Sequence, residues 1–285
     1  MEEAGGVGGE GGLEKFASSA PIIRLHPHLR RAAYWALLPL IVPQGLLLRR
    51  NAPRFPPAAG PHAGRVGFGK SLKLLAIGDS IIAGVGAPNV GQALPGQVAK
   101  ALARRLGCEI HWHATGRIGL DAREVKRDLL PSIPHHAFEA MVVSVGVNDV
   151  TSLKRSRRWR TELTALLDAL QAHSPHAVIA LMGVPPLGSF PLLRPPLRTV
   201  LGLRATMFDA IASEIAAPRE RVVHIALDMD ARPEKFSADG YHPSAESYAE
   251  LGEHVTQAMV ARIFAIEALD SHAPSGSNGP QATRP

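Results

Sequence analysis

Short apolar runs alternate along the chain with longer segments in which apolar residues recur every three or four positions. The apolar runs, which have the length of buried strands, are residues 72–77, 109–114, 140–145, 177–183 and 221–226. The segments with helical periodicity are residues 92–106, 121–130, 159–173, 198–217 and 244–267. Five alternations of strand and helix predict an α/β domain built on a parallel sheet.

This alternation also predicts where a ligand site should lie. Right-handed crossovers between parallel strands place helices on both faces of the sheet. We therefore expect a flavodoxin-like three-layer α/β/α sandwich with a five-stranded parallel sheet. Ligands of such open sheets bind at the carboxyl ends of the strands, so the loops that follow the strands are the ones expected to carry chemistry.

The predicted domain covers residues 71–267, and segments of different composition flank it. Residues 1–70 form a leader that begins Gly-rich and acidic, contains an apolar stretch at 32–48, and ends in a Pro/Gly-rich segment at 51–69 that is typical of a linker. Residues 268–285 are rich in Ser, Gly and Pro and are expected to form a disordered tail.

The apolar stretch 32–48 carries no charge and has a pair of arginines on each side. Its 17 residues fall short of the roughly 20 that a membrane-spanning helix needs, and two prolines and a glycine interrupt it. No cleavage site typical of a secretory signal follows it. Two interpretations stay open: a segment lying on an anionic membrane surface, or a hydrophobic arm packed on the protein's own core.

Composition and charge narrow the class of protein. With 285 residues, of which 46% are hydrophobic and 20% charged, the chain is not mainly disordered or fibrous. The net charge is +6, but residues 21–70 hold eight basic and no acidic residues, which leaves the domain nearly neutral. This argues against nucleic acid as a partner and makes a membrane surface the anionic partner to expect, through residues 21–70. The single cysteine, Cys108, excludes an intrachain disulfide.

Polar blocks follow three successive predicted strands. Gly78-Asp79-Ser80 places a serine at a strand-to-helix turn, where its N–H favours a developing negative charge. Gly119 lies in the next loop, where a backbone N–H can approach a substrate closely. Gly146-Val147-Asn148-Asp149 offers the Asn148 amide as a further donor. Each block alone is better explained as a turn or a helix cap.

A fourth block, Asp239-Gly240-Tyr241-His242, follows the last predicted strand. A carboxylate three residues before a histidine can bind the imidazole Nδ1 and leave Nε2 facing a nucleophile. Taken together, the four blocks bring a nucleophile, oxyanion donors and a base to the carboxyl ends of the strands. Acyl-transfer enzymes need that combination.

The same four blocks resemble those of the SGNH (GDSL) hydrolases, over roughly residues 72–265. The resemblance implies ester hydrolysis without a cofactor or a metal, with Ser80 as nucleophile, His242 as general base and Asp239 orienting the histidine. It also implies an oxyanion hole formed by the Ser80 N–H, the Gly119 N–H and the Asn148 side chain. The second block departs from the family pattern, because Ala114 stands where members often have Asn.

Several functions remain compatible with these residues. The first is a serine esterase, lipase or lysophospholipase-like enzyme on a small ester or lipid. The second is an acyltransferase, or a deacylase of a glycan or thioester, that uses the same site. The third, from another class, is a non-catalytic phosphate-binding module, although the Gly-rich turn at 78–86 fits neither the G-x-G-x-x-G nor the P-loop pattern. Serine-directed labelling would distinguish the enzymes from the module.

Two further groups of residues have two interpretations each. The long Pro-rich loop 184–197 lies at the ligand end of the sheet, so Phe190, Leu192 and Leu193 line an acyl pocket or pack the loop on itself. The basic run from Lys154 to Arg158 either attracts an anionic head group or, as we favour, is a solvated helix start. The expected location is cytoplasmic, at a membrane surface if the leader binds one. The oligomeric state is left open.

Overall fold

The computed structural model describes residues 43–45, 55–228 and 232–272. Its strands are β1 (Ala63–Val66), β2 (Ser71–Gly78), β3 (Glu109–Gly116), β4 (Ala140–Ser144), β5 (Val178–Met182) and β6 (Val222–Ile225). Its longer helices are α2 (Leu94–Leu106), α5 (Ser156–His173), α6 (Leu197–Ala216) and α7 (Ala245–His272). The short helical elements are η2 (Val90–Gln92), α3 (Ala122–Glu124), η3 (Val125–Leu129), η4 (Leu130–Ser132), α4 (Val147–Thr151), η5 (Leu187–Ser189) and η6 (Pro233–Lys235).

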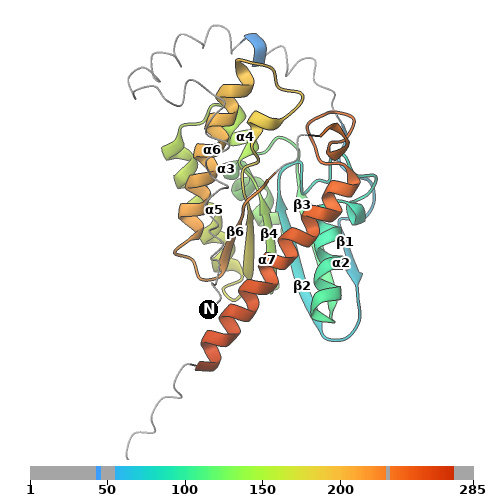
Figure 1. Cartoon of the computed structure of the whole chain (residues 1–285). Coiled ribbons are helices and arrows are strands. Elements are labelled where there is room, and N and C mark those ends of the chain that lie inside the picture. The colour runs from blue at the N-terminus through green and yellow to red at the C-terminus, as the bar shows by residue number, and fades with distance from the viewer. Residues whose placement is uncertain (1–42, 46–54, 229–231, 273–285) are drawn as a thin grey trace, which may run out of the picture.

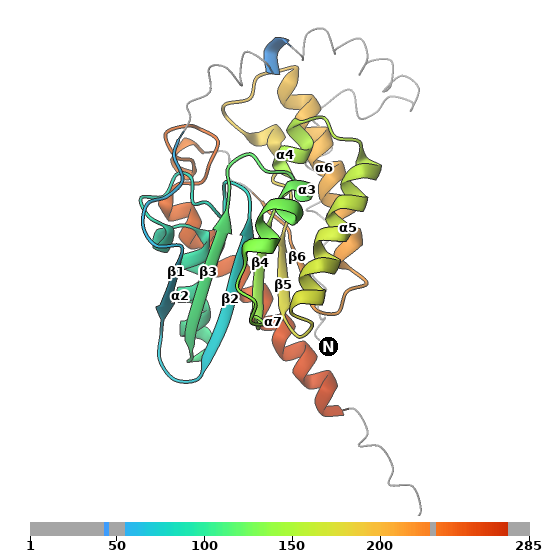
Figure 2. The same ribbon diagram turned by 180° about the vertical axis from the view of Figure 1, so that it is seen from behind.

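The five predicted strands are all present and form the parallel part of the sheet. Their order is β3-β2-β4-β5-β6, so the first strand of this set lies between the second and the third, as in flavodoxin-like sheets. The prediction of an α/β fold with helices flanking a largely parallel sheet is confirmed. Figures 1 and 2 show α2 and α7 on one face of the sheet and α3, α5 and α6 on the other.

The sheet has a sixth strand, which the sequence did not indicate. Residues Ala63–Val66 pair antiparallel with β3 at the edge of the sheet, within the segment predicted to be a linker. The strand has only four residues, and its side chains alternate between exposed and half-buried. A short edge strand of this kind carries little apolar signal, and the surrounding prolines and glycines conceal what remains.

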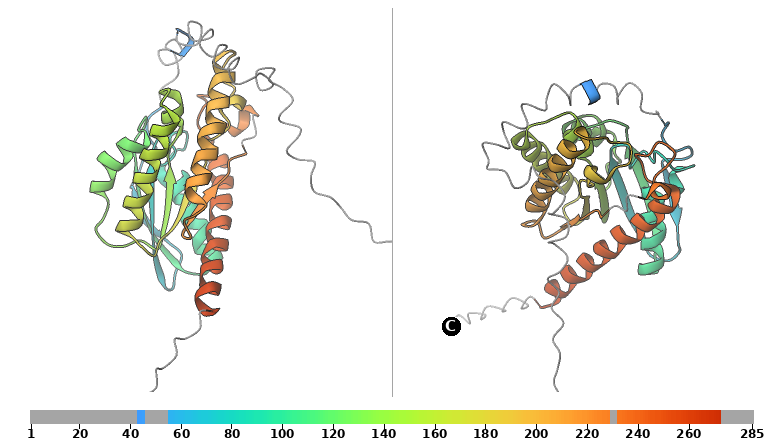
Figure 3. Two further views of the ribbon diagram at one scale, coloured as in Figure 1. Left: turned by 90° about the vertical axis from the view of Figure 1, so that its left-hand side faces the viewer. Right: turned by 45° about the horizontal axis from the view of Figure 1, so that its top comes forward.

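The two faces of the sheet each support a hydrophobic core. Strands β2, β4 and β5 are apolar at successive positions because they are buried on both faces. In β2, Leu75 and Ile77 pack with α5 and α6, whereas Leu74 and Ala76 pack with α2 and α7. Helix α7 closes the second face, and its C-terminal end extends past the sheet (Figure 3).

The register of the strands brings the candidate loops together. Gly78, the last residue of β2, lies opposite Gly116 of β3 and Ser144 of β4. The three strands therefore end at the same level, and the loops that follow them begin side by side. The blocks that contain Ser80, Gly119 and Asn148 emerge at this edge.

The predicted leader and tail lie largely outside the described residues. Of the apolar stretch 32–48, only 43–45 are described, and there the Gln44 side chain bonds to the backbone of Pro195 and Leu197 at the start of α6. No helix in the described part of the chain is long and apolar enough to cross a membrane. Contact of residues 21–70 with a membrane surface and the cytoplasmic location stay predictions.

Candidate active site

Ser80 lies in the turn that follows β2, and the end of β2 is held closely against β4. The Asp79 N–H donates to the Ser144 carbonyl over 3.0 Å. A Cβ on Gly78 would stand 2.0 Å from the same carbonyl oxygen, so only glycine allows the two strands to approach this closely. The backbone after Ser80 continues as a series of turns, in which the Val85 N–H donates to the Ser80 carbonyl over 3.0 Å.

Ser80, His242 and Asp239 form a continuous hydrogen-bonded chain. His242 Nε2 lies 2.9 Å from Ser80 Oγ, and His242 Nδ1 lies 2.6 Å from Asp239 Oδ2. The two contacts join a residue after β2 to a loop 162 positions further along. The predicted nucleophile, base and orienting carboxylate therefore lie together, in the arrangement needed to draw a proton from a serine hydroxyl.

The Asp239 carboxylate is buried and fully engaged. Its Oδ1 accepts hydrogen bonds from the Tyr241 and His242 N–H groups and from the Ser237 hydroxyl, over 2.8–2.9 Å. Burial acts to raise the pKa of Asp239, but these donors and His242 outweigh it, so the pKa lies below its ordinary value. The carboxylate stays ionised and holds the imidazole in one orientation.

Two hydrogen bonds hold the His242 loop in shape and fix the helix that follows it against the Ser80 turn. The Ser237 N–H donates to the His242 carbonyl over 2.8 Å and closes the loop on itself. The Tyr248 hydroxyl, fully buried in α7, donates to the Val85 carbonyl over 2.8 Å. This bond fixes the start of α7 against the turn that follows the serine.

The two remaining oxyanion candidates, Gly119 and Asn148, lie in the loop after β3 and in the first turn of α4. Gly119 has φ of +85°, a conformation that favours glycine, and a Cβ there would meet no heavy atom within 4 Å. The Asn148 Nδ2 donates to the Leu120 carbonyl over 2.9 Å, and the Arg117 N–H donates to the Gly78 carbonyl over 3.1 Å. These bonds hold the Gly119 loop between the end of β2 and α4. Asn148 Nδ2 carries a second hydrogen, which can donate to a further acceptor.

A cavity of about 330 Å³ opens beside Ser80 and His242, within the size range of small-ligand sites. Its apolar wall is formed by Met182, Phe190, Leu227 and Leu251. Of the three loop residues predicted to line an acyl pocket, Phe190 is in the wall. Leu193 shares the core on the α5 and α6 face with Phe190 but does not line the cavity, and Leu192 lies near Gly240.

Asp79, directly before Ser80, is a buried carboxyl group for which the sequence pattern indicated no role. Its Oδ1 accepts from the Ile81 N–H over 3.1 Å and from the Ser144 hydroxyl over 3.0 Å. Burial raises the pKa of Asp79 to about 6, against an ordinary value of 3.8. Asp79 thus holds the first turn after Ser80 while remaining easier to protonate than a surface carboxyl.

The raised pKa predicts how stability depends on pH. The fold favours the protonated carboxyl, so wild-type stability relative to Asp79→Asn is highest below pH 3.8 and falls as pH rises through about 6. Between about pH 4.5 and pH 7 the wild type should lose about 2 kcal/mol relative to the variant, whose amide can still accept both bonds. Urea unfolding of both proteins at the two pH values measures this. An equal gap at both would mean that Asp79 titrates normally.

Comparison with known proteins identifies the chain. A model of the GDSL-like lipase/acylhydrolase family matches residues 76–250, which is more than half of the chain and runs from the end of β2 to the start of α7, the span that carries the site. The chain belongs to the GDSL-like lipase/acylhydrolase family. The resemblance seen in the four sequence blocks is thereby confirmed.

Individual relatives agree with this family. GDSL-like esterase Rv1075c of Mycobacterium tuberculosis is 27% identical over 185 residues, which are 62% of this chain and 58% of the relative. The chain therefore spans less than two thirds of that relative's length. The esterase EstA of Pseudoalteromonas sp. superposes with a TM-score of 0.52, at 17% identity over 68% of this chain and 98% of the other. A family 3 carbohydrate esterase of Clostridium thermocellum gives 0.55, at 17% identity over 69% and 99%. These two structures share the fold.

Within this GDSL-like domain, Lys154 is placed differently from the expectation. The sequence favoured a solvated basic helix start, but the Lys154 side chain is only 6% exposed and lies among three carboxylates. Arg155, Arg157 and Arg158 are exposed, as expected. The sequence around Lys154 does not indicate burial, because the carboxylates that surround its side chain come from three different elements of the fold.

Proposed function

We propose that the protein hydrolyses carboxylic esters through an acyl-enzyme formed on Ser80. The observation that carries this proposal is the contact of His242 Nε2 with Ser80 Oγ at 2.9 Å, together with that of Nδ1 with Asp239 at 2.6 Å. Membership of a family of lipases and acylhydrolases supports it, as do the names of the esterases to which the chain is similar.

The mechanism follows from the donors and acceptors at the site. Ser80 Oγ attacks the ester carbonyl carbon while its proton passes to His242 Nε2. The carbonyl oxygen becomes an oxyanion and accepts from the Ser80 N–H, the Gly119 N–H and the Asn148 amide. Each such donor lowers the barrier by about 3 kcal/mol. The carbonyl re-forms, the alcohol leaves with the proton from His242, and Ser80 remains acylated.

Water completes the cycle by the same steps. His242 Nε2 takes a proton from a water molecule, whose oxygen attacks the acyl carbon of the acyl-enzyme. The second oxyanion collapses, the acid leaves, and His242 returns the proton to Ser80 Oγ. The ionised Asp239 stabilises the imidazolium in both halves of the cycle. No residue is consumed, so the enzyme turns over.

Hydrolysis of p-nitrophenyl butyrate by the full chain tests this proposal, with nitrophenol and butyric acid measured in the presence of an added alcohol. We expect both products in equal amounts. Nitrophenol with the butyryl group on the alcohol would assign acyl transfer instead. A folded protein that releases no nitrophenol would contradict both.

The cavity beside Ser80 supports the proposal that the acyl chain of the ester lies against Phe190. Replacing Phe190 with alanine enlarges the cavity, so the preferred acyl length should increase, with the ratio of kcat/KM for octanoate to butyrate esters rising by about tenfold. The ratio is the right measure because Phe190 also contacts Tyr241 edge-on, with ring centroids 5.2 Å apart. Loss of that contact should lower both rates together.

The matched control for this acyl-length experiment is Leu193→Ala. Leu193 comes from the same loop and is buried in the same core as Phe190, but it does not line the cavity, so its truncation should lower the melting temperature and leave the octanoate-to-butyrate ratio unchanged. A ratio that stays constant in Phe190→Ala would reject the cavity as the acyl site. A ratio that shifts equally in Leu193→Ala would show that loop disorder, rather than cavity size, sets the preference.

A further inference from the structure

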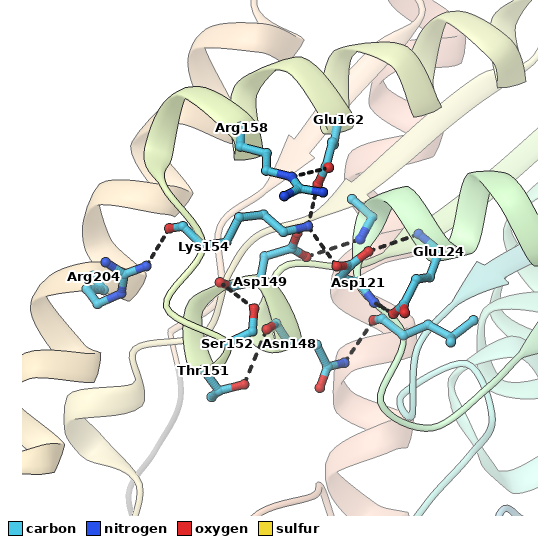
Figure 4. Close-up of polar contacts among 12 residues, drawn as sticks. Asp121, Glu124, Asn148, Asp149, Thr151, Ser152, Lys154, Arg158, Glu162 and Arg204 are labelled. Atoms are coloured by element: carbon cyan, nitrogen blue, oxygen red, sulfur yellow. Dashed lines mark hydrogen bonds and ion pairs between the residues drawn. The ribbon is translucent and has the colours of Figure 1, made fainter. Parts of the chain in front are cut away.

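A buried lysine lies among three carboxylates next to the oxyanion candidates. Lys154 Nζ is 2.8 Å from Asp121 Oδ2 and 2.6 Å from Asp149 Oδ1, and it also pairs with Glu162 (Figure 4). The Lys154 side chain is 6% exposed and that of Asp149 is fully buried. The carboxylates come from the start of α3, from α4 and from α5, so one ammonium group joins three elements.

Two of these carboxylates are neighbours of the oxyanion donors in sequence. Asp149 directly follows Asn148, and Asp121 is two residues after Gly119. Direct hydrogen bonds already connect the two segments, from Asn148 Nδ2 to the Leu120 carbonyl over 2.9 Å and from the Ala122 N–H to Asp149 Oδ2 over 3.2 Å. Lys154 adds a charged link across the same junction, through Asp121 and Asp149.

The junction depends on this positive charge. Carboxylate oxygens of Asp121, Asp149 and Glu162 lie within 4.8 Å of one another, a distance at which like charges in a buried site repel strongly. Such a group would also suit a divalent cation, but Lys154 Nζ already lies among the three and supplies the charge. Burial raises the pKa of Asp149 to about 6 even with Lys154 beside it. Without the ammonium, repulsion would push the Asp121 loop away from α4.

The backbone around Lys154 is arranged to hold the side chain there. Leu153 has φ of +56°, a left-handed conformation that costs energy for a residue with a branched side chain and is kept only when its surroundings require it. The turn lets the Lys154 N–H donate to the Asp149 carbonyl over 3.1 Å. Arg204 of α6 donates to the Lys154 carbonyl over 2.6 Å. Both contacts direct Lys154 back over α4.

We propose that Lys154 is a positioning residue that fixes the Gly119 loop against Asn148, so that both donors reach the same oxyanion. This inference rests on the proposed function. Lys154 does not touch the substrate; it acts through the loop that it joins to α4. Its removal should therefore affect the transition state, in which the oxyanion forms, more than substrate binding.

The first test compares Lys154→Met with Arg158→Met. Lys154→Met should lower kcat for p-nitrophenyl butyrate by about 30-fold and change KM by less than about twofold. Arg158 pairs with the same Glu162, but its side chain is 55% exposed, so Arg158→Met should stay within about twofold of wild type in both constants. An unchanged kcat in Lys154→Met, measured well below its melting temperature, would overturn the inference.

A double-variant experiment separates positioning from general destabilisation. In an Asn148→Ala background one of the two donors is already lost, so Lys154→Met should lower kcat by less than about threefold further. The full 30-fold loss in that background would mean that Lys154 acts independently of Asn148 and would overturn the inference. If Lys154→Met does not fold, Asp121→Asn serves in its place, since asparagine can still cap α3 but loses the charge paired with Lys154.

The Ser80→Ala variant keeps the two proposals distinguishable. If wild-type hydrolysis is absent, or persists in Ser80→Ala, the proposed function fails. If hydrolysis depends on Ser80 but kcat is unchanged in Lys154→Met, only the role of Lys154 is rejected.

Discussion

Replacing Ser80 with alanine should lower kcat for ester hydrolysis by at least about 10⁴-fold. The change removes the one oxygen that His242 Nε2 faces, at 2.9 Å, and leaves the oxyanion donors and the cavity intact. Rates that remain after loss of a nucleophile come from those binding groups alone. Steady-state kinetics on p-nitrophenyl butyrate, together with a melting curve to show that the variant is folded, measure this.

A second serine provides the control for this change. Ser213 is exposed on α6, so Ser213→Ala should keep the wild-type kcat. If Ser80→Ala retained more than about one tenth of wild-type turnover while folded, Ser80 would not be the nucleophile.

Replacing Asp239 with asparagine should lower kcat by about 10³- to 10⁴-fold, because it changes which imidazole nitrogen of His242 carries the proton. The Oδ1 atom of asparagine can still accept from Ser237, Tyr241 and His242, so the loop should keep its shape. The amide nitrogen, however, would replace Oδ2 at 2.6 Å from His242 Nδ1 and donate to it. The ring proton would then sit on Nε2, which could no longer accept the Ser80 proton.

Two measurements show whether Asp239→Asn changes only the chemistry: its melting temperature and its KM. Both should stay close to those of the wild type, since the hydrogen bonds at Oδ1 persist. A loss of less than about tenfold in kcat would show that the orientation of His242 does not depend on this carboxylate.

Much of the fold could be predicted because the central strands are buried on both faces. Continuous apolar runs such as residues 140–145 indicate strands without any knowledge of tertiary contacts. The edge strand Ala63–Val66 could not be found this way, because an edge strand buries only one row of side chains. Its partner β3, which is 44 residues further along at the closest pairing (Val66 with Ile110), decides its structure.

The candidate site was predictable in part, for a related reason. Parallel strands end at a common edge, so the blocks with Ser80, Asn148 and His242 could be expected to meet once the strands were known. The burial of Asp79 and Lys154 could not be expected, since each depends on partners from other strands and helices. Which side chains of loop 184–197 face the cavity was equally hidden: Phe190 and Leu193 are both buried in the core on the α5 and α6 face, but of the two only Phe190 also lines the cavity.

Labelling with a fluorophosphonate tests the central claim most directly, since the reagent reacts only with a serine that a neighbouring base has activated. The account predicts a single adduct per chain of 285 residues, located on Ser80 by peptide mass mapping, absent from Ser80→Ala and strongly slowed in Asp239→Asn. A folded protein that takes up no label, or a Ser80→Ala variant that is labelled as fast as the wild type, would contradict it.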